Sequence, residues 1–132
     1  MNDDLTRLVR RAEALLDRVD ALLPPPPAAI DWQTTLAARW QARPGGRRAL
    51  VAIEHPQRLD LDDLQGIDRV KTALDRNTRQ FLAGAPANDA LLWGSRGTGK
   101  SSLVKALLTR HAAQGLRLIE VDKDRLVDLP DI

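Results

Sequence analysis

The chain opens with apolar residues that recur at spacings of three and four. They are Leu5, Leu8, Val9, Ala12, Leu15, Leu16, Val19, Leu22 and Leu23. This spacing places them on one face of an amphipathic helix, which Asn2 or Asp3 can cap. The four prolines at 24–27 end the helix, because proline has a fixed φ and no backbone donor. We therefore expect a helix within residues 1–23 and a proline-rich linker over 24–30. The helix is expected to pack on its own domain, a sister subunit or another protein.

Residues 31–57 predict a helix followed by a short strand. Asp31 is a candidate cap, and Pro44-Gly45-Gly46 is a stop signal. Between them, three apolar residues repeat at helical spacing: Trp32, Leu36 and Trp40. The apolar run 49–53 then predicts a strand.

From residue 58 the pattern changes to alternating strands and helices. Gly66 opens a helix whose apolar positions keep helical spacing until Gly84 and Pro86. Next come an apolar run at 90–93, a helical segment at 100–114 and a second apolar run at 116–121. Two strands joined through a helix are expected to be parallel, with a right-handed crossover.

The loop between the first of these strands and its helix carries the clearest chemical signal. It has the form G-x-x-x-x-G-K-[ST], after an apolar strand and before a helix. Its residues are Gly94, Ser95, Arg96, Gly97, Thr98, Gly99, Lys100 and Ser101, followed by Ser102. This pattern in this context predicts a phosphate-binding loop, and the alternative is a glycine-rich turn that binds nothing.

Each position in the loop has a physical reason. Glycines allow positive φ, so that N–H groups from Gly97 to Ser102 can point at phosphate oxygens, assisted by the positive end of the following helix. Lys100 can reach the β and γ phosphates and is the candidate catalytic residue. Ser101 is placed to bind Mg²⁺, and Ser102 to face the α-phosphate. Arg96 lies at the crest of the loop and is a candidate to contact phosphate or a neighbouring molecule; the alternative, which we expect, is that its side chain lies in solvent.

Residues 59–130 resemble the AAA+ ATPase superfamily, and most closely the bacterial family called domain of unknown function 815. Four stretches carry the resemblance: 61–69, 77–84, 91–103 and 118–123. The loop is typical of P-loop NTPases in general, whereas Leu64-Gln65-Gly66-Ile67 narrows the likeness to AAA+ proteins. In that superfamily the corresponding segment packs on adenine, so the resemblance implies that Leu64 and Ile67 contact the base.

The resemblance implies an α/β fold: an incomplete P-loop NTPase (AAA+-like) parallel sheet with helices, preceded by an α-helical N-terminal region. Residues 58–132 are then the N-terminal part of an AAA+ ATP-binding domain, with ATP and Mg²⁺ as ligands. AAA+ proteins also have an acidic Mg²⁺ and water-activating motif, sensors, an arginine finger and a helical lid, which this chain lacks. We therefore expect nucleotide binding without efficient hydrolysis, homo-oligomers of the complete protein, and a macromolecular client that the sequence does not identify.

Two other functions fit parts of the pattern. A P-loop kinase shares Gly97-x-Gly99-Lys100-Ser101, although the long segment before the loop favours the AAA+ interpretation. A non-enzymatic interaction protein would use the N-terminal apolar stripe to dock a partner, with the loop as a relic.

The composition limits the class of protein and the kinds of site that this chain can form. With 132 residues and 43% hydrophobic residues, the chain is long and apolar enough to form a core. It has no cysteine, which excludes disulfides and thiolate metal sites. Its longest uncharged stretch, 21–30, includes four prolines and is shorter than the roughly 20 apolar residues that a membrane span needs. The net charge of +2 gives little reason to expect nucleic-acid binding. We expect a cytoplasmic protein without membrane association.

Overall fold

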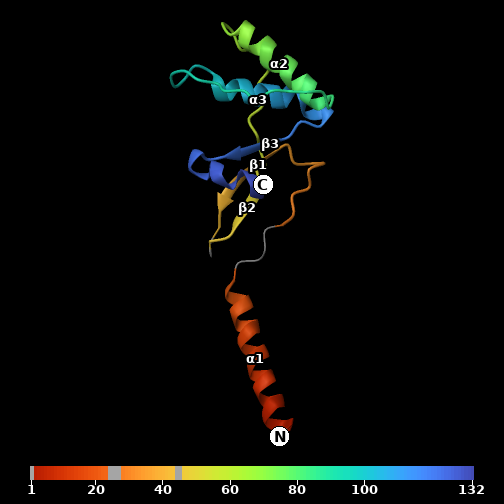
Figure 1. Cartoon of the computed structure of the whole chain (residues 1–132), viewed down its shortest axis with the longest axis vertical. Coiled ribbons are helices and arrows are strands. Elements are labelled where there is room, and N and C mark those ends of the chain that lie inside the picture. Colours follow the sequence, from red (N-terminus) through yellow and green to blue (C-terminus); the bar gives the residue numbers. More distant parts are fainter. Residues whose placement is uncertain (1, 24–27, 44–45) are drawn as a thin grey trace.

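The computed structural model describes residues 2–23, 28–43 and 46–132, and it is a mixed α/β structure (Figure 1). The elements in chain order are α1 (Asn2–Leu22), β1 (Ala37–Ala42), β2 (Arg48–Ala52), α2 (Asp68–Leu82), α3 (Lys100–His111), β3 (Leu118–Val121) and two 3-10 helices, η1 (Ala112–Gln114) and η2 (Lys123–Asp131). The prolines of the expected linker lie outside the described residues.

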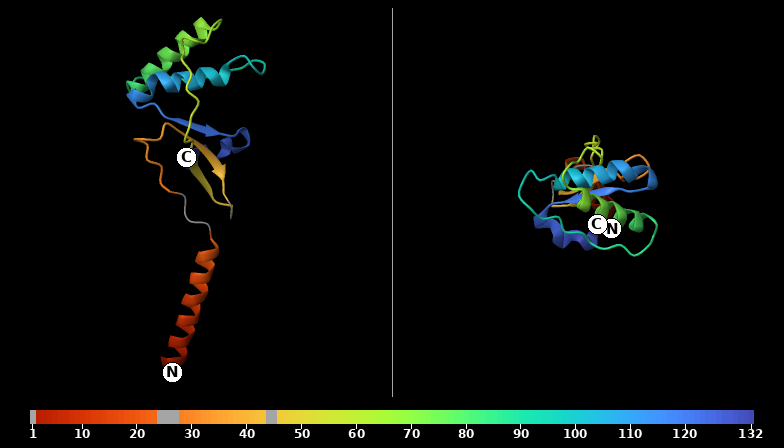
Figure 2. Two further views of the ribbon diagram at one scale, coloured as in Figure 1. Left: turned by 180° about the vertical axis from the view of Figure 1, so that it is seen from behind. Right: turned by 90° about the horizontal axis from the view of Figure 1, so that it is seen from above.

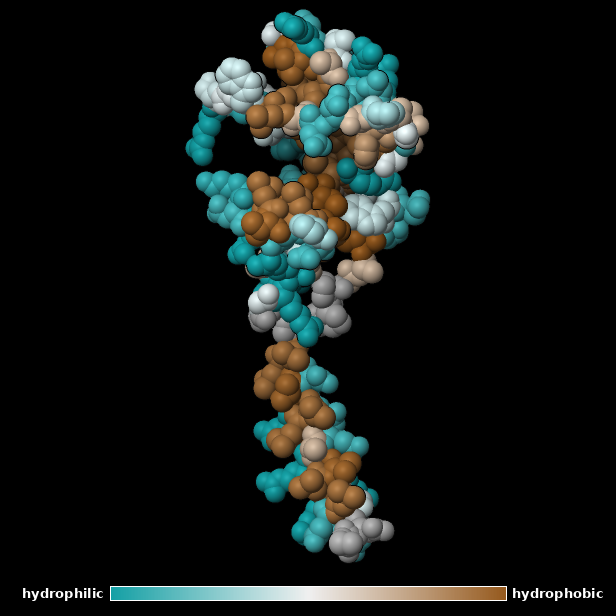
Figure 3. All heavy atoms as spheres, viewed as in Figure 1, coloured by the Kyte–Doolittle hydropathy of each residue, from teal (hydrophilic) through white to brown (hydrophobic). Residues whose placement is uncertain are grey.

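Helix α1 confirms the first prediction and extends away from the sheet (Figure 1). Every side chain of the helix that the structure describes is exposed, including the apolar ones. In the space-filling view the apolar residues form a continuous stripe along the helix (Figure 3). Of the three partners expected for this stripe, its own domain is therefore not the one seen here. None of the described helices is both long enough and apolar enough to span a membrane.

The helix predicted from Asp31 to Gly45 is wrong. Asp31 does cap a turn, because its carboxylate accepts hydrogen bonds from the backbone N–H of Gln33 (2.9 Å) and the hydroxyl of Thr34 (3.1 Å). After this turn the chain becomes extended and forms β1. The strand places Ala38 and Trp40 on its buried face and Arg39 on its exposed face. The two tryptophans and Leu36 fit helical spacing, but pairing with the neighbouring strand decides the local structure.

Strand β1 is the centre of a three-stranded sheet with the order β2-β1-β3. It pairs antiparallel with β2 in a register that sets Trp40 opposite Leu50, and parallel with β3, with Ala37 opposite Leu118. The strands predicted at 49–53 and 116–121 are thus confirmed, but the sheet is mixed rather than wholly parallel. The sheet pairs β1, which precedes the domain boundary expected at residue 58, with β3, which follows that boundary.

The strand predicted at 90–93 is also wrong. This segment is irregular, with Leu91 and Trp93 exposed and Leu92 packed against the core. A strand needs a hydrogen-bonded neighbour, and β3 has β1 as its parallel partner instead. The segment before it is held by Asn77, whose side chain donates to the carbonyl of Asn88 (2.7 Å) and accepts from its N–H (2.9 Å).

Helices α2 and α3 lie side by side at the end of the molecule opposite α1 (Figures 1 and 2). Three buried residues of α3 (Leu103, Ala106 and Leu107) form one core with Leu61 from the segment before α2, and Leu74 of α2 packs against this core. Both helices confirm the apolar periodicity of the sequence, and α3 continues through η1 to Gly115. This packing fixes the start of α3, and hence the end of the glycine-rich loop.

The 3-10 helix η2 is fastened to the hairpin by a buried carboxylate. Asp128, which is 3% exposed, accepts a hydrogen bond from the indole of Trp40 (3.1 Å) and pairs with the guanidinium of Arg48. Trp40 lies in β1 and Arg48 in β2, so one side chain near the end of the chain bridges two strands. Nothing in the apolar pattern of the sequence pointed to this contact.

Candidate nucleotide-binding site

The glycine-rich loop leads directly into the first turn of α3. Gly94, Gly97 and Gly99 have φ of +139°, +82° and +80°, values that side-chain-bearing residues rarely adopt. Gly99 immediately precedes the helix, which begins at Lys100. The glycines at these positions therefore meet a backbone requirement, as the sequence predicted.

Lys100 folds back over the loop and makes three hydrogen bonds to it. Its ammonium group donates to the carbonyl oxygens of Gly94 (2.9 Å) and Ser95 (2.6 Å) and to the hydroxyl of Thr98 (3.1 Å). The Thr98 hydroxyl in turn donates to the carbonyl of Ser95 (2.9 Å). These contacts place the charge of Lys100 inside the curve of the loop, at the first turn of α3.

The backbone donors of the loop have no protein partner in the described part of the chain. The first N–H of this region to find an acceptor is that of Leu103, which donates to the carbonyl of Gly99 (2.8 Å). The N–H groups of residues 94–102 donate to no described oxygen. Ser101 is exposed and Ser102 is half-buried, while Arg96 is exposed at the far end of the loop as predicted. Unpaired donors at a helix N-terminus are a suitable environment for an anion.

An apolar groove of about 370 Å³ lies beside the loop. Ile67 and Val70 line it from the start of α2, Trp93 lines it from the segment before the loop, and Thr98, Gly99 and Lys100 form the side next to α3. The structure therefore brings Ile67 to the loop. Leu64 does not line the groove: its side chain packs against the core, and its carbonyl accepts a hydrogen bond from Lys71 (2.6 Å).

Val70 and Trp93 are lining residues that the sequence reasoning missed. Trp93 was assigned to a buried strand, where its ring would have pointed into a sheet. A large aromatic ring immediately before the first glycine of the loop was the signal that could have indicated a wall of the site. Val70 lies three residues after Ile67, which is one turn further along the same helix face.

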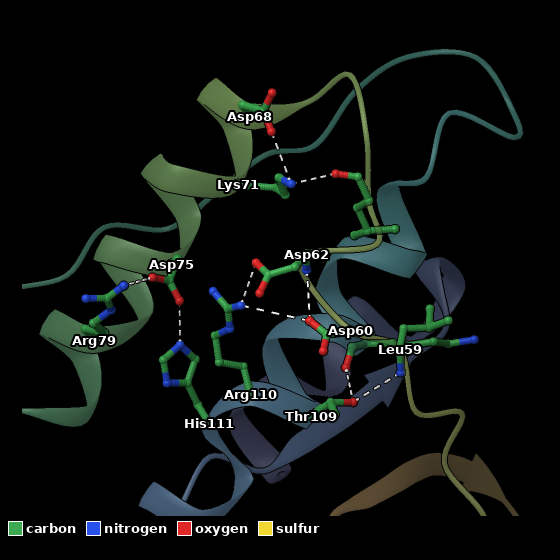
Figure 4. Close-up of polar contacts among 12 residues, drawn as sticks. Leu59, Asp60, Asp62, Asp68, Lys71, Asp75, Arg79, Thr109, Arg110 and His111 are labelled. Atoms are coloured by element: carbon green, nitrogen blue, oxygen red, sulfur yellow. Dashed lines mark hydrogen bonds and ion pairs between the residues drawn. The ribbon is translucent and has the colours of Figure 1, made fainter.

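A second polar cluster joins α2 to the end of α3 (Figure 4). Asp75 is 5% exposed; it contacts Nε2 of His111 at 2.7 Å and pairs with Arg79. Burial by itself raises the pKa of Asp75, but the hydrogen bonds from His111 and Arg79 outweigh it and leave that pKa below its ordinary value. An ionised Asp75 can only accept, so Nε2 of His111 is the donor, and its buried Nδ1 has no partner among the described residues.

The polar cluster borders a cavity of about 420 Å³ whose rim carries paired charges. Arg110 pairs with Asp62 at 2.8 Å, and this hydrogen bond raises the pKa of Arg110. Lys71 pairs with Asp68 at 3.1 Å. Arg110 and Lys71 already have acidic partners, whereas Arg76, which lines the same cavity, is exposed and has none among the described residues. The paired charges make the polar cluster a link between α2 and α3.

No acidic side chain pairs with the side chains of the loop in the part of the chain that the structure describes. Nor do the described residues include a group of three or more His, Cys, Asp or Glu side chains arranged to hold a metal ion. The exposed hydroxyl of Ser101 offers an oxygen ligand of the type that Mg²⁺ binds alongside phosphate oxygens.

Comparison with curated proteins and with solved structures gives no match. A family match covers residues 33–132, from the turn before β1 through the whole sheet, the glycine-rich loop and η2. This is more than half of the chain. The chain belongs to the family described as "Protein of unknown function (DUF815)".

Proposed function

We propose that residues 94–102 bind the phosphates of ATP together with Mg²⁺, and that the chain is the nucleotide-binding part of an AAA+-type ATPase. The observation that carries the proposal is the position of Lys100, whose ammonium group lies within the curve of a loop with unpaired N–H donors. A cation, a helix N-terminus and free backbone donors at one place favour a polyphosphate.

Binding of the phosphates follows from these donors. The β and γ phosphates take the place of some loop oxygens as acceptors for Lys100, and the N–H groups of the loop donate to the remaining phosphate oxygens. Ser101 contributes its hydroxyl to the Mg²⁺ that bridges the phosphates, and Ser102 faces the α-phosphate. Thr98 keeps the loop closed through its bond to Ser95.

The apolar groove beside the loop is the proposed site for the base. It is continuous with Lys100 and is lined by Ile67, Val70 and Trp93, which offer apolar and aromatic surface to a planar ring. Leu64 supports the site from the core instead of touching the base, so its proposed role changes from contact to packing.

The same geometry favours binding over efficient hydrolysis. P-loop NTPases hold Mg²⁺ with a second acidic residue and orient the attacking water with another. In the described residues the loop side chains have no acidic partner. We therefore propose that this chain binds ATP and hydrolyses it slowly by itself.

Calorimetric titration with Mg²⁺-ATP tests the proposal. Saturable binding is expected for the native chain, and Lys100→Ala is expected to weaken it roughly ten- to hundredfold, since a charge-assisted hydrogen bond contributes about 1.5–3 kcal/mol. The matched control is Lys105→Ala, which removes an ammonium group from the same helix that bonds to Gln57 (3.2 Å) and not to the loop.

Two results would contradict the proposal. One is equal affinity of Lys100→Ala and the native chain. The other is a folded native chain that binds neither ATP nor inorganic triphosphate. A chain that binds both ligands equally tightly would leave the phosphate site intact but remove the apolar groove from the proposed binding site.

A further inference from the structure

We propose that α1 associates with α1 of other copies of this chain, in parallel and in register. The first observation is exposure: the apolar side chains of α1 are uncovered along its whole length, from 46% exposed at Val9 to 84% at Leu22. Most helical stability in proteins comes from packing an apolar face rather than from the helix by itself. The apolar stripe of α1 therefore needs a cover that its own domain does not supply.

The second observation is the spacing of the stripe. In heptad notation, positions a and d are all apolar across the helix: Leu5, Leu8, Ala12, Leu15, Val19 and Leu22. The spacing alternates between three and four without interruption, which is the repeat of helices that wind around one another. Val9, Leu16 and Leu23 add the e position, so the stripe is wider than that of a simple two-stranded seam.

The third observation decides which partner covers the stripe. Successive residues advance by roughly 100° around a helix, so a stripe at d, a and e is flanked by position g on one side and by position b on the other. The g side carries Asp4, Arg11 and Arg18, whereas the b side carries Thr6, Glu13 and Asp20. Over residues 11–20 the stripe is therefore basic along its g edge and acidic along its b edge.

Two copies of such a helix are complementary when they run parallel. The basic edge of one helix then faces the acidic edge of the next, with Arg11 beside Glu13 and Arg18 beside Asp20 of the other copy, at the same offset in both pairs. In an antiparallel pair each edge would meet its own kind, which sets Arg against Arg and acid against acid. The charges thus favour further copies of α1 over a helix of opposite direction, and they allow each copy to contact one neighbour on either side.

Sedimentation velocity of the full chain tests the proposal. The native chain is expected to form species heavier than the 14.6 kDa monomer as its concentration rises. The double variant Arg11→Glu/Arg18→Glu is expected to sediment as a monomer at the same concentrations, and so is Glu13→Arg/Asp20→Arg. An equal mixture of the two double variants is expected to recover the heavier species, because each supplies the charge that the other lacks.

The matched control and a cross-linking test complete the design. Arg10→Glu/Asp17→Arg changes charges at position f, opposite the apolar stripe, and is expected to leave sedimentation unchanged. The chain has no cysteine, so Leu5→Cys introduces a single thiol. Oxidation is expected to form a disulfide-linked dimer, since parallel copies bring these residues together, whereas antiparallel copies would hold them about 25 Å apart.

The proposal is overturned if the native chain stays monomeric throughout, or if the mixture of the two charge variants remains monomeric. It is equally overturned if the heavier species forms while Leu5→Cys gives no cross-linked dimer. None of these outcomes bears on Mg²⁺-ATP binding, because α1 contributes nothing to the loop or to the apolar groove.

Discussion

At the scale of single residues, the molecule relies on a few carboxylates that contact groups far away in the sequence. Asp75 and His111 are 36 positions apart, and Asp128 lies 80 positions from Arg48. Each carboxylate is almost fully buried, so its loss leaves a polar group without a partner in an apolar setting. Such a loss costs more than the bond itself contributes, because the desolvated group has no water to replace the missing partner.

Asp75→Ala is expected to lower the free energy of unfolding by about 1–3 kcal/mol, because it leaves the buried His111 ring without a hydrogen bond on either nitrogen. Urea unfolding followed by circular dichroism measures the change. Arg69→Ala, at an exposed position of the same helix, is the control and is expected to stay within about 0.5 kcal/mol of the native chain. Equal destabilisation by both variants would contradict the role given to Asp75.

The lowered pKa of Asp75 also predicts a dependence of stability on pH. A carboxyl whose folded-state pKa lies below the unfolded value of about 3.9 contributes stability that is fully present above that pH. The contribution is lost as the pH falls through the folded-state pKa. Asp75→Asn removes the titration while keeping the size of the side chain. The difference in unfolding free energy between the native chain and Asp75→Asn should therefore shrink from about pH 6 to about pH 3; a constant difference would refute this.

At the scale of elements, the hairpin and η2 depend on one another. The indole N–H of Trp40 has Asp128 as its acceptor, and the side chain of Asp128 also holds Arg48 beside it. The 3-10 helix has little else to fix it, since Leu126, Val127 and Leu129 are all more than half exposed. A single buried carboxylate therefore decides whether this last segment packs against the sheet.

Asp128→Ala is expected to detach η2 and to destabilise the chain by about 1–3 kcal/mol, because the buried indole of Trp40 loses its acceptor. The accompanying shift of tryptophan fluorescence toward longer wavelength reports the wetting of that ring. Asp131→Ala removes an exposed carboxylate from the same 3-10 helix and serves as the control. If the fluorescence of Asp128→Ala matched that of the control, Asp128 would not be the link between η2 and the hairpin.

The sequence predicted those elements that periodicity alone determines. The helices α1, α2 and α3 each repeat apolar residues over several turns, and β2 is a compact apolar run, so a local pattern was sufficient. The local apolar pattern gave a wrong prediction at β1 and at residues 90–93, because in each place it is compatible with more than one secondary structure. Trp32, Leu36 and Trp40 fit a helix, but strand pairing with β2 and β3 makes residues 37–42 extended. Leu91 to Trp93 fit a strand, but the segment has no strand partner, because β3 pairs with β1 instead.

In the candidate site, too, local sequence determines some features and contacts between distant residues determine others. The loop from Gly94 to Ser101 was found from sequence because its chemistry depends on residue types at fixed spacing. The wall formed by Val70 and Trp93 was missed, since it exists only through the packing of α2 against the segment before the loop. Asp75 and Asp128 gave no local signal at all, because their partners are distant in sequence.

At the scale of the whole molecule, α1 is joined to the rest of the chain without burying any described side chain. Deletion of residues 2–23 is therefore expected to leave the unfolding free energy of the remainder within about 0.5 kcal/mol of the native value. All three tryptophans follow this segment, so urea unfolding followed by their fluorescence reports on the remainder alone. The comparison is made at low chain concentration. A loss of several kcal/mol would show that α1 packs on its own domain after all.

The parallel pairing of β1 with β3 has a consequence for how the protein is made. Arg39 and its sheet neighbour Glu120 are 81 positions apart. At about 5–20 residues per second, a ribosome takes roughly 4–16 s to synthesise the stretch between them. For most of that interval, once β2 has been made, the nascent hairpin of β1 and β2 has an open edge at its future central strand, a template for unwanted pairing. The exposed charge of Arg39 sits in that strand, where it disfavours pairing with a second nascent hairpin until Glu120 emerges to neutralise it.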